Sequence, residues 1–470
     1  MTTNTAPPLS VPRGAALYIG ALLGPGVLLL PGLAASIAGP AAILAWAGLL
    51  GVSALFAVMF TALGTRYPGE GGVSAYAAAG LGPRAGYAVG WSFLLGVVAG
   101  APVVCLIGGG YVASLAGGGQ AMATAVAAGL LLAVLGLALA GMRASTGVQM
   151  VLVVLLVAVV VAAVAGSAPA ARMANWHPFA PHGWAAVGKA ASVIMLSFVG
   201  WEAVAPLTAR FGNARRRLPR VVAIAFGTTA ALYLTMAAAT TAVLGHAAGG
   251  SVPLADLLAI AIGPAGRAVA AGAAVLLTLG AVNAYLSGAA VMARSLTARP
   301  ARDGADQNSA GPQSAGGGRP SPVLLIGIAA TGLLVIAAAS AHLVSTTQLV
   351  TVPTALFLTV YLGCTAAASR VLRGPARVAA AGALAAVAVI MVFSGWAAVL
   401  AVLTAGTAAA LYRRRPAEVP APSQPAAPVR TGGAAGPRGA RLALALAHPN
   451  GVTGRRTARP AQEGSACRAA

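Results

Sequence analysis

Acidic residues, and charged residues in general, are scarce in this chain of 470 residues. Only 8% of the residues are charged, and seven Asp and Glu stand against 29 Lys and Arg. Soluble globular domains carry roughly 25% charged residues, and disordered chains are poor in hydrophobic ones, so the composition excludes both classes. The basic residues lie at the ends of apolar runs and in a tail, not on a face interleaved with aromatic residues. We therefore expect no nucleic-acid partner.

Cysteine and histidine are also few, and they are too scattered for most enzyme chemistry. Cys105 and Cys364 fall in apolar runs and Cys467 in the tail, so no disulfide framework is expected. Four histidines fall in loop segments without the spacing of metal ligands: His177, His182, His246 and His342. The glycine-rich loop 67–72 lacks the lysine of a phosphate-binding loop, and no nucleophile–base pair is visible. We predict that the protein is not an enzyme and has no metal or cofactor.

Long apolar runs, in contrast, are abundant. Hydrophobic residues make up 59% of the chain. A helix needs about 20 mostly apolar residues to cross a bilayer, so the sequence predicts an all-α polytopic membrane protein. We expect twelve transmembrane helices, at 14–38, 41–65, 84–116, 121–141, 145–167, 186–210, 219–245, 265–292, 322–340, 345–368, 377–393 and 395–412.

The basic residues predict the orientation of these spans, because Lys and Arg are enriched in cytoplasmic loops. An even number of spans puts both termini on one side. Sixteen arginines fall on that side: Arg13, Arg66, Arg84, Arg143, Arg210, Arg215, Arg216, Arg217, Arg220, Arg294, Arg299, Arg302, Arg319, Arg370, Arg373 and Arg377. The other side receives three basic residues: Arg172, Lys189 and Arg267. We therefore predict a plasma-membrane protein with both termini in the cytoplasm.

Three segments differ in composition along the chain. Residues 1–12 are polar and lack the features of a cleavable signal peptide, so we expect a cytoplasmic tail and insertion directed by the first span. Residues 13–413 form the predicted transmembrane domain. Residues 414–470, rich in Pro, Ala, Gly and Arg, are predicted to be disordered, with the basic start of this tail against anionic lipids of the inner leaflet. The polar loop 299–321 is a predicted flexible connection.

Two of the apolar runs are interrupted. Gly24-Pro25-Gly26 breaks the first, because Pro25 has no N–H and its neighbours have no side chains. Residues 197–202 break the sixth, and Pro206 follows one turn later. Interrupted spans at corresponding places in two repeats point to the substrate site of a transporter. We predict inverted five-span repeats at about 14–167 and 186–368, with the helices at 377–412 outside them.

The exposed backbone at such breaks suits a zwitterion. The N–H groups of Gly26 and Val27, at the start of a half-helix, suit a carboxylate. The carbonyl groups near Leu22 and Leu23 suit an ammonium. The second break offers the same kinds of groups in three residues of its own, Leu196, Ser197 and Val199. The alternative is a pair of kinks that only shape packing.

Glu202 is the one acidic residue inside a predicted span, and an unpaired charge there is costly. Two roles are open. The carboxyl group could take up a proton from the cavity, or it could remain protonated and hold the break open by hydrogen bonds to loose carbonyl groups. Asp256, which follows Pro253 in a loop on the opposite side to the termini, is expected to be a solvated loop residue.

The motifs in this order resemble the amino acid–polyamine–organocation superfamily of secondary transporters. They are Gly24-Pro25-Gly26-Val27 with Leu30-Pro31, Arg66-Tyr67-Pro68 with Gly71-Gly72, Gly82-Pro83, Phe198-Val199-Gly200-Trp201-Glu202, and Asn213-Ala214-Arg215 with Leu218-Pro219-Arg220. Further strings resemble its branch of methionine and branched-chain amino acid exporters: Val89-Gly90-Trp91-Ser92-Phe93-Leu94, Asn283-Ala284-Tyr285 and Val360-Tyr361-Leu362-Gly363-Cys364. The resemblance runs from about Pro12 to Arg415.

The resemblance implies a LeuT-type fold, with broken helices 1 and 6, that works by alternating access. It implies that Gly26, flanked by Gly24 and Pro25, binds a substrate carboxylate. Carbonyl groups of Leu22, Leu196 and Val199 would meet the amine, and the neighbouring Gly200 would also belong to the substrate site. Glu202 would be a gating and proton-sensing acid, and Phe93 and Trp201 gating aromatics. The sequence departs from some relatives at two positions. Pro25 stands where some relatives have a serine between the two glycines, and Leu156 stands in the fifth span where some proton-coupled relatives have a lysine.

These observations predict a secondary transporter of small neutral, apolar amino acids, with export favoured over uptake. Its partners would be the amino acid, membrane lipids and, through Glu202, protons. Three alternatives remain open: an uptake permease or exchanger for another amine, an amino acid sensor that does not transport, and a passive channel. Oligomeric state is not predicted.

Overall fold

Helices make up the regular structure in the part of the chain that the computed structural model describes. That part comprises residues 10–24, 26–67, 72–140, 146–202, 211, 214–297 and 322–412. No β-strand occurs in these ranges, which confirms the predicted all-α class. The chain divides into two compact units, Met1–Pro422 and Ser423–Ala470, and all described residues lie in the first. Pro25, Pro206, the loop 299–321 and the tail 414–470 lie outside the described residues.

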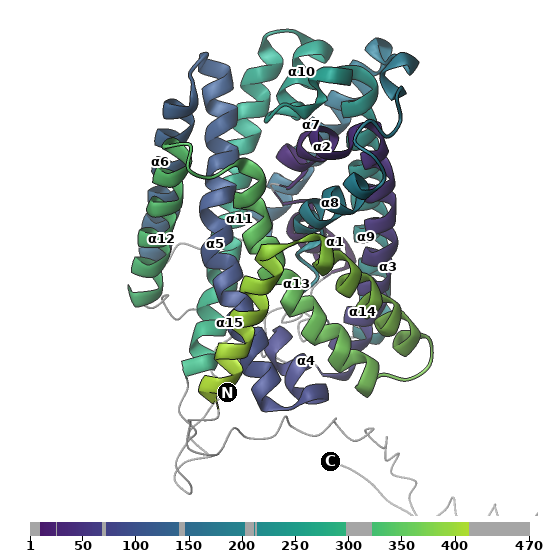
Figure 1. Cartoon of the computed structure of the whole chain (residues 1–470), viewed down its shortest axis with the longest axis vertical. Coiled ribbons are helices and arrows are strands. Elements are labelled where there is room, and N and C mark those ends of the chain that lie inside the picture. Colours follow the sequence, from purple (N-terminus) through teal and green to yellow (C-terminus); the bar gives the residue numbers. More distant parts are fainter. Residues whose placement is uncertain are drawn as a thin grey trace, which may run out of the picture. The chain divides into compact units, whose positions relative to one another are not determined.

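The helices follow the predicted spans to within a few residues. In chain order they are α1 (Val11–Leu23), α2 (Gly26–Ala38), α3 (Ala42–Arg66), α4 (Gly72–Leu81), α5 (Pro83–Ala116), α6 (Gln120–Leu139), α7 (Thr146–Ser167), α8 (Ala185–Ile194), α9 (Ala214–Ala239), α10 (Pro253–Ile262), α11 (Ala265–Thr297), α12 (Pro322–Ser340), α13 (Thr346–Val371), α14 (Pro375–Phe393) and α15 (Trp396–Tyr412). A 3₁₀ turn, η4 (Met195–Phe198), continues α8. Figure 1 shows most of them running along the long axis of the bundle.

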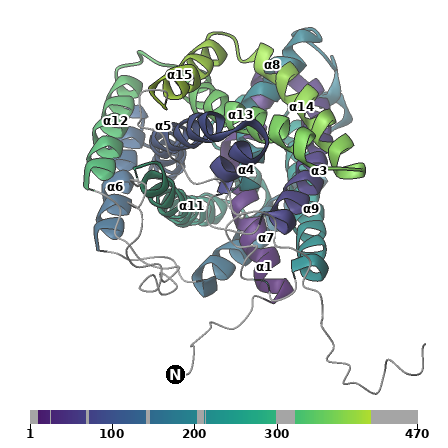
Figure 2. The same ribbon diagram turned by 90° about the horizontal axis from the view of Figure 1, so that it is seen from below.

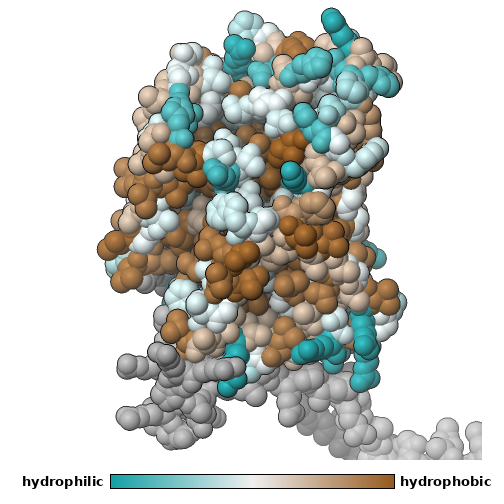
Figure 3. Space-filling view, viewed as in Figure 1, coloured by the Kyte–Doolittle hydropathy of each residue, from teal (hydrophilic) through white to brown (hydrophobic). Residues whose placement is uncertain are grey.

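Nine helical segments of the described ranges are long and apolar enough to cross a membrane, and the first of them runs over Val11–Arg66. Shorter apolar helices at Ala185–Phe198 and Trp396–Tyr412 lie where the sixth and twelfth spans are predicted. On the face in Figure 3, apolar side chains gather over the middle and hydrophilic ones toward the two ends. The polytopic helical class is thereby confirmed. The count of twelve spans and the inverted repeats stay predictions.

Two short helices, α4 and α10, lie at opposite ends of the bundle and were not predicted (Figure 1). The expectation that Asp256 is a solvated loop residue is wrong, because it lies half-buried in the first turn of α10. Partial burial raises the pKa of its carboxyl group, and the positive charge of Arg267 partly offsets that rise. Pro253 at the start of α10 suits the first helical position, where no N–H is needed.

Several helix ends follow from local sequence. α5 begins at Pro83 and ends before Gly117, whose φ of 66° is the left-handed conformation that glycine adopts most readily. α13 begins with a capping box, in which Ser345 Oγ accepts from the N–H of Gln348 and the Gln348 side chain accepts from the N–H of Ser345. These local signals set the ends of long, mostly apolar helices.

α5 is the central helix on one side of the bundle. It packs against α4, α6, α11, α13 and α15, and α6 and α12 form the periphery there (Figure 2). On the other side, one face of α3 presents Trp46, Ser53 and Phe56 to the interior, where they meet side chains of α9, α13 and the second break. Cys105 and Cys364 are buried and free. The two breaks therefore lie between α3 on one side and α5 on the other.

Candidate functional site

The first interruption separates α1 from α2. α1 ends at Leu23, Gly24 has φ 23° and ψ −169°, and α2 begins at Gly26. A side chain at Gly24 would be strained by this φ value, although no atom would obstruct its Cβ. Pro25, the centre of the predicted motif, lies outside the described residues. The first predicted span is therefore two half-helices.

The second interruption follows α8. The helix tightens into the 3₁₀ turn η4, and Val199 then becomes extended with φ −73° and ψ 126°. Gly200 has φ 149°, and a Cβ there would lie 2.5 Å from the carbonyl oxygen of Ala21. Both the dihedral angle and the close approach therefore require glycine at this position.

The two interruptions contact each other directly. A Cβ on Gly26 would lie 2.5 Å from Ser197 Oγ and 3.2 Å from Ser197 Cα. Gly200 of the second break packs equally closely on the first, because a Cβ on Gly200 would lie 2.5 Å from the carbonyl oxygen of Ala21. Each break thus contributes one glycine that lets the backbone of the other approach. The structure brings together the two segments that the sequence analysis paired by spacing alone.

A cavity lies beside this contact. The space open to the centre of a water molecule is about 60 Å³, enough for several waters or part of a small ligand. Its lining residues are Ala21, Leu22, Gly24, Gly26, Leu30, Gly96, Val97, Gly100, Ala101, Val104, Ile107, Leu196, Ser197, Val199, Val282, Tyr285 and Phe357. Six residues predicted for the binding site are among them: Leu22, Gly24, Gly26, Leu196, Ser197 and Val199. Two are not, because Val27 is fully buried and Gly200 packs on Ala21.

The walls of the cavity are apolar. α5 supplies Val97, Val104 and Ile107 along one side, while α11 supplies Val282 and α13 supplies Phe357. Among the described lining residues, the polar side chains are those of Ser197 and Tyr285, and none is charged. The other lining residues have side chains without polar atoms. Such a lining suits a ligand with an apolar side chain and a compact polar end.

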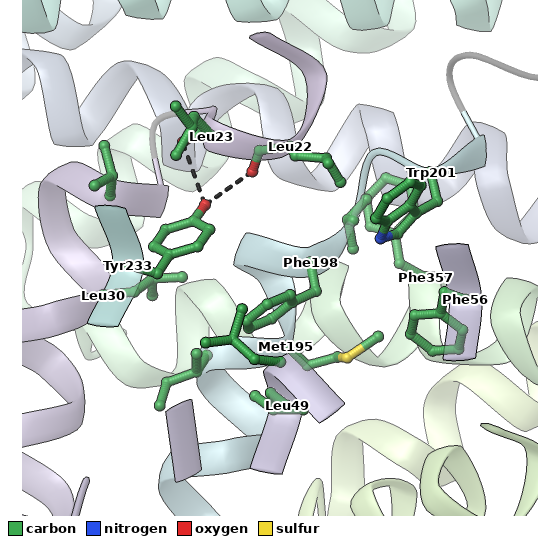
Figure 4. Packing of buried hydrophobic residues seen from close by; sticks show 14 of the residues in the cluster. Leu22, Leu23, Leu30, Leu49, Phe56, Met195, Phe198, Trp201, Tyr233 and Phe357 are labelled. Atoms are coloured by element: carbon green, nitrogen blue, oxygen red, sulfur yellow. Dashed lines mark hydrogen bonds between the residues drawn. The ribbon is translucent and has the colours of Figure 1, made fainter. Parts of the chain in front are cut away.

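Three tyrosines, two of them buried and Tyr285 half-buried, bind the carbonyl groups of the breaks. Tyr233 Oη on α9 lies 2.8 Å from Leu22 O, 3.3 Å from Leu23 O and 3.1 Å from Ser197 O. Figure 4 shows its hydroxyl group pointing at Leu22 and Leu23. Tyr285 on α11 donates to Val199 O over 3.3 Å. The third, from α13, is described below with Glu202.

The carbonyl groups at the breaks were expected to be unpaired, but tyrosine hydroxyl groups donate hydrogen bonds to several of them. The sequence analysis did not single out Tyr233, and it quoted Tyr285 and Tyr361 only within family motifs. A signal was present, since a buried tyrosine needs a partner for its hydroxyl group and these three lie in apolar runs. Each carbonyl oxygen has two lone pairs, so a bond from tyrosine leaves room for a second donor.

Glu202, the last described residue of the second break, does not line the cavity. It is 3% exposed, and its Oε2 accepts from the N–H of Gly200 over 3.0 Å. Tyr361 Oη lies within hydrogen-bond distance of both this Oε2 and Phe198 O. Oε1 has no partner among the described residues. The hydrogen bonds to Oε2 are consistent with a structural role, in which Glu202 stabilises the second break. Because Oε1 has no partner among the described residues, the role of Glu202 as a proton carrier stays open as well.

Phe93 and Trp201, the predicted gating aromatics, are both buried away from the cavity. Phe93 packs against Phe357, which lines the cavity, with the two rings 5.9 Å apart in an edge-to-face arrangement. Trp201 Nε1 donates to Ser53 Oγ over 3.0 Å, and its ring lies 6.1 Å from that of Tyr18. The aromatic side chains that border the cavity are instead Phe357 and Tyr285. In the described part of the chain, no three His, Cys, Asp or Glu residues form a group that could hold a metal ion.

Comparison with known proteins agrees with this arrangement. A family model described as amino acid permease matches residues 9–403. An uncharacterized amino acid permease of Bacillus subtilis, YecA, is 32% identical over 389 residues, which cover 82% of this chain and 90% of the relative. The L-methionine/branched-chain amino acid exporter YjeH of Escherichia coli is 34% identical over 227 residues, 46% of this chain and 52% of the relative. The branched-chain amino acid permease BcaP of B. subtilis is 27% identical over 247 residues, 48% of this chain and 53% of the relative.

The family model spans both interruptions and the helices that line the cavity, and the match to YecA extends over most of both chains. The resemblance to the amino acid–polyamine–organocation superfamily is confirmed. This chain belongs to the amino acid permease family and is a membrane transporter.

Proposed function

We propose that the protein is a secondary active carrier that exports small neutral, apolar amino acids of the methionine, leucine, isoleucine and valine class. One observation carries the proposal: two interrupted helices meet at an apolar cavity whose described lining residues carry no charged side chain. The uncharged lining favours a substrate without a charged side chain. A zwitterion could be bound by backbone N–H groups at its carboxylate and by carbonyl groups at its ammonium.

The names of two relatives support the substrate class. One is an exporter of methionine and branched-chain amino acids and the other a branched-chain amino acid permease. Their cargo is apolar in both cases, in keeping with the walls formed here by Val97, Val104 and Val282. We propose export because the motifs of the third, eighth and tenth predicted spans resemble the exporter branch. Uptake is the rival direction.

The carrier would work by alternating access in the plasma membrane, with both termini in the cytoplasm. The two breaks are the elements expected to move, since α3 and α5 beside them are continuous helices. Protons are a proposed partner through Glu202, whose Oε1 has no partner among the described residues.

Export can be tested in a bacterial strain that overexpresses the chain and is fed dipeptides containing leucine or methionine. An exporter lowers the internal amino acid concentration and raises the external one, relative to a strain without the protein. An uptake permease shifts both concentrations the other way, and a sensor that does not transport leaves the external concentration unchanged.

The matched controls are two glycine substitutions. Gly26→Leu puts a side chain into the contact between the breaks, whereas Gly136→Leu adds the same side chain on the exposed face of α6, where nothing lies within 4 Å of the new Cβ. Gly26→Leu should abolish export while the protein remains in the membrane, and Gly136→Leu should keep it. Export by Gly26→Leu at the normal rate would contradict the site, and absence of export with the unmodified chain would contradict the proposed direction.

A further inference from the structure

Three aromatic side chains gather where the start of α5 meets the end of α15, at the end of the bundle that carries α4 (Figure 1). The ring centroid of Tyr87 lies 6.2 Å from that of Trp91 on α5 and 5.5 Å from that of Tyr412, the last residue of α15. All three side chains are half-buried, and none of them lines the cavity at the breaks. We call these three residues, together with Arg84, the α5–α15 corner. The transport site leaves them without a role.

The corner is a fixed surface of two packed helices. Arg84, Tyr87 and Trp91 are three and four positions apart, a spacing that places side chains next to one another on one face of a helix. One turn after Trp91, Leu95 of α5 packs in an apolar cluster that includes Ala401 of α15. α15 also packs directly on α5 in the structure, and Figure 2 shows the two helices side by side. The contact between the helices therefore holds the aromatic rings in place.

The corner is positively charged and has no acidic neighbour in the described part of the chain. Arg84, in the first turn of α5, is exposed. The described acidic residues are Glu202, which is buried in the second break, and Asp256, which lies in α10 at the opposite end of the bundle. The three residues that follow Tyr412 in the sequence are arginines as well, and they lie outside the described residues. An anionic group is the ligand that such a surface favours.

The face of α15 that leads to the corner is apolar and exposed. Leu403 is 60% exposed and Leu411 is 58% exposed. In a membrane protein such side chains meet the acyl chains of lipids. Tyrosine and tryptophan, which combine an apolar ring with a polar tip, are enriched at the level of the lipid headgroups. The order along the surface, with leucines, then aromatic rings, then an arginine, matches the order of groups along a phospholipid.

We propose that the α5–α15 corner binds one anionic phospholipid, whose phosphate group lies at Arg84 and whose acyl chains lie along the exposed leucines of α15. The guanidinium group donates parallel hydrogen bonds to the phosphate oxygens, and the three rings contact the part of the lipid between phosphate and acyl chains. A zwitterionic headgroup carries its own ammonium group and gains less from Arg84. A free phosphate has no acyl chains, so it gains nothing from α15 or from the rings.

Arg84→Gln tests the proposal in the purified full-length chain. The chain is titrated in detergent with dioleoylphosphatidylglycerol or dioleoylphosphatidylethanolamine, and native mass spectrometry counts the bound lipid. The unmodified chain should bind the anionic lipid more tightly. Arg84→Gln should raise the Kd for phosphatidylglycerol about fivefold, the contribution of one basic residue near an anionic headgroup, and leave the Kd for phosphatidylethanolamine unchanged. An unchanged Kd for phosphatidylglycerol would overturn the proposal.

Arg377→Gln is the matched control. Arg377 is also exposed, but it lies in the first turn of α14, which packs on α3, α8 and α13. The substitution removes the same charge and should leave both Kd values unchanged. Equal losses of phosphatidylglycerol binding in Arg84→Gln and Arg377→Gln would mean that the lipid responds to the total positive charge of the protein. That result would overturn a site at the corner.

Two further measurements test the aromatic rings and the identity of the ligand. Trp91→Leu and Tyr412→Leu remove a ring and keep an apolar side chain, so each should weaken the binding of both lipids by a similar factor. Tyr412 ends α15, so its variant provides the test if Trp91→Leu does not fold. Unchanged Kd values in the variants that fold would overturn the site. Glycerol 3-phosphate at the same concentration should not displace phosphatidylglycerol, and displacement would assign the corner to a free phosphate instead of a lipid and overturn the proposal.

Discussion

The contact between Gly26 and Ser197 predicts a large effect from the smallest possible substitution. Gly26→Ala adds one methyl group, 2.5 Å from Ser197 Oγ, 3.3 Å from its Cβ and 3.2 Å from its Cα. An ordinary contact begins near 3.4 Å, so the hydroxyl group must retreat by about 0.9 Å and the backbone by a few tenths of an ångström. Overpacking of this kind costs about 1–3 kcal/mol. Because about 1.4 kcal/mol corresponds to a factor of ten, transport efficiency should fall by roughly 5- to 150-fold.

The assay is kcat/KM for leucine uptake into proteoliposomes, with the amount of inserted protein measured in parallel. A double-mutant cycle with Ser197→Ala identifies the cause. This second substitution removes the oxygen that the new methyl group meets, so the combined variant should recover part of the loss. We expect an interaction energy of about 0.5–2 kcal/mol in the direction of recovery. Gly26→Ala with unchanged kcat/KM, or strictly additive losses in the double variant, would refute the close approach of the two breaks.

Three further predictions follow from other contacts. Gly200→Ala should abolish transport, because φ 149° and the Ala21 carbonyl both exclude a Cβ, and normal uptake by this variant would contradict the geometry of the second break. Glu202→Gln keeps an oxygen that can accept from the Gly200 N–H, so the protein should still insert into the membrane. The pH profile of uptake should flatten because the amide takes up no proton. An unchanged pH profile would assign Glu202 a purely structural role. Deletion of residues 416–470 should leave leucine transport intact, whereas a sensor that signals through its basic tail would lose its output.

The positions of the helices and of both breaks could be predicted from the sequence. Apolar runs of membrane length specify helices. Gly24 and Gly200 adopt positive φ angles that other residues rarely adopt, so glycine inside an apolar run was a usable signal of each break. α4 and α10 were missed because ten-residue apolar segments carry no clear signal of helix or loop. Asp256 was misjudged for the same reason.

The detailed site could be predicted only in part, because it depends on how helices are rotated and packed. Periodicity places Phe93 within a span but does not show that Phe93 packs against Phe357 and that Phe357 lines the cavity. Similarly, Tyr233 lies 36 residues from Ser197 and more than 200 from Leu22, so no local pattern reveals that its hydroxyl reaches both. Backbone groups of the breaks were predictable as candidates, whereas the tyrosines that satisfy them required tertiary structure.

Counterflow tests the central claim most directly, namely that the two helix breaks form the amino acid site of a carrier. Proteoliposomes containing the unmodified chain are loaded with unlabelled leucine and diluted into a trace of labelled leucine. We predict saturable, transient accumulation of label by the unmodified protein and by Gly136→Leu, and none by Gly26→Leu. Absence of accumulation with the unmodified protein, or full accumulation with Gly26→Leu, would contradict the account.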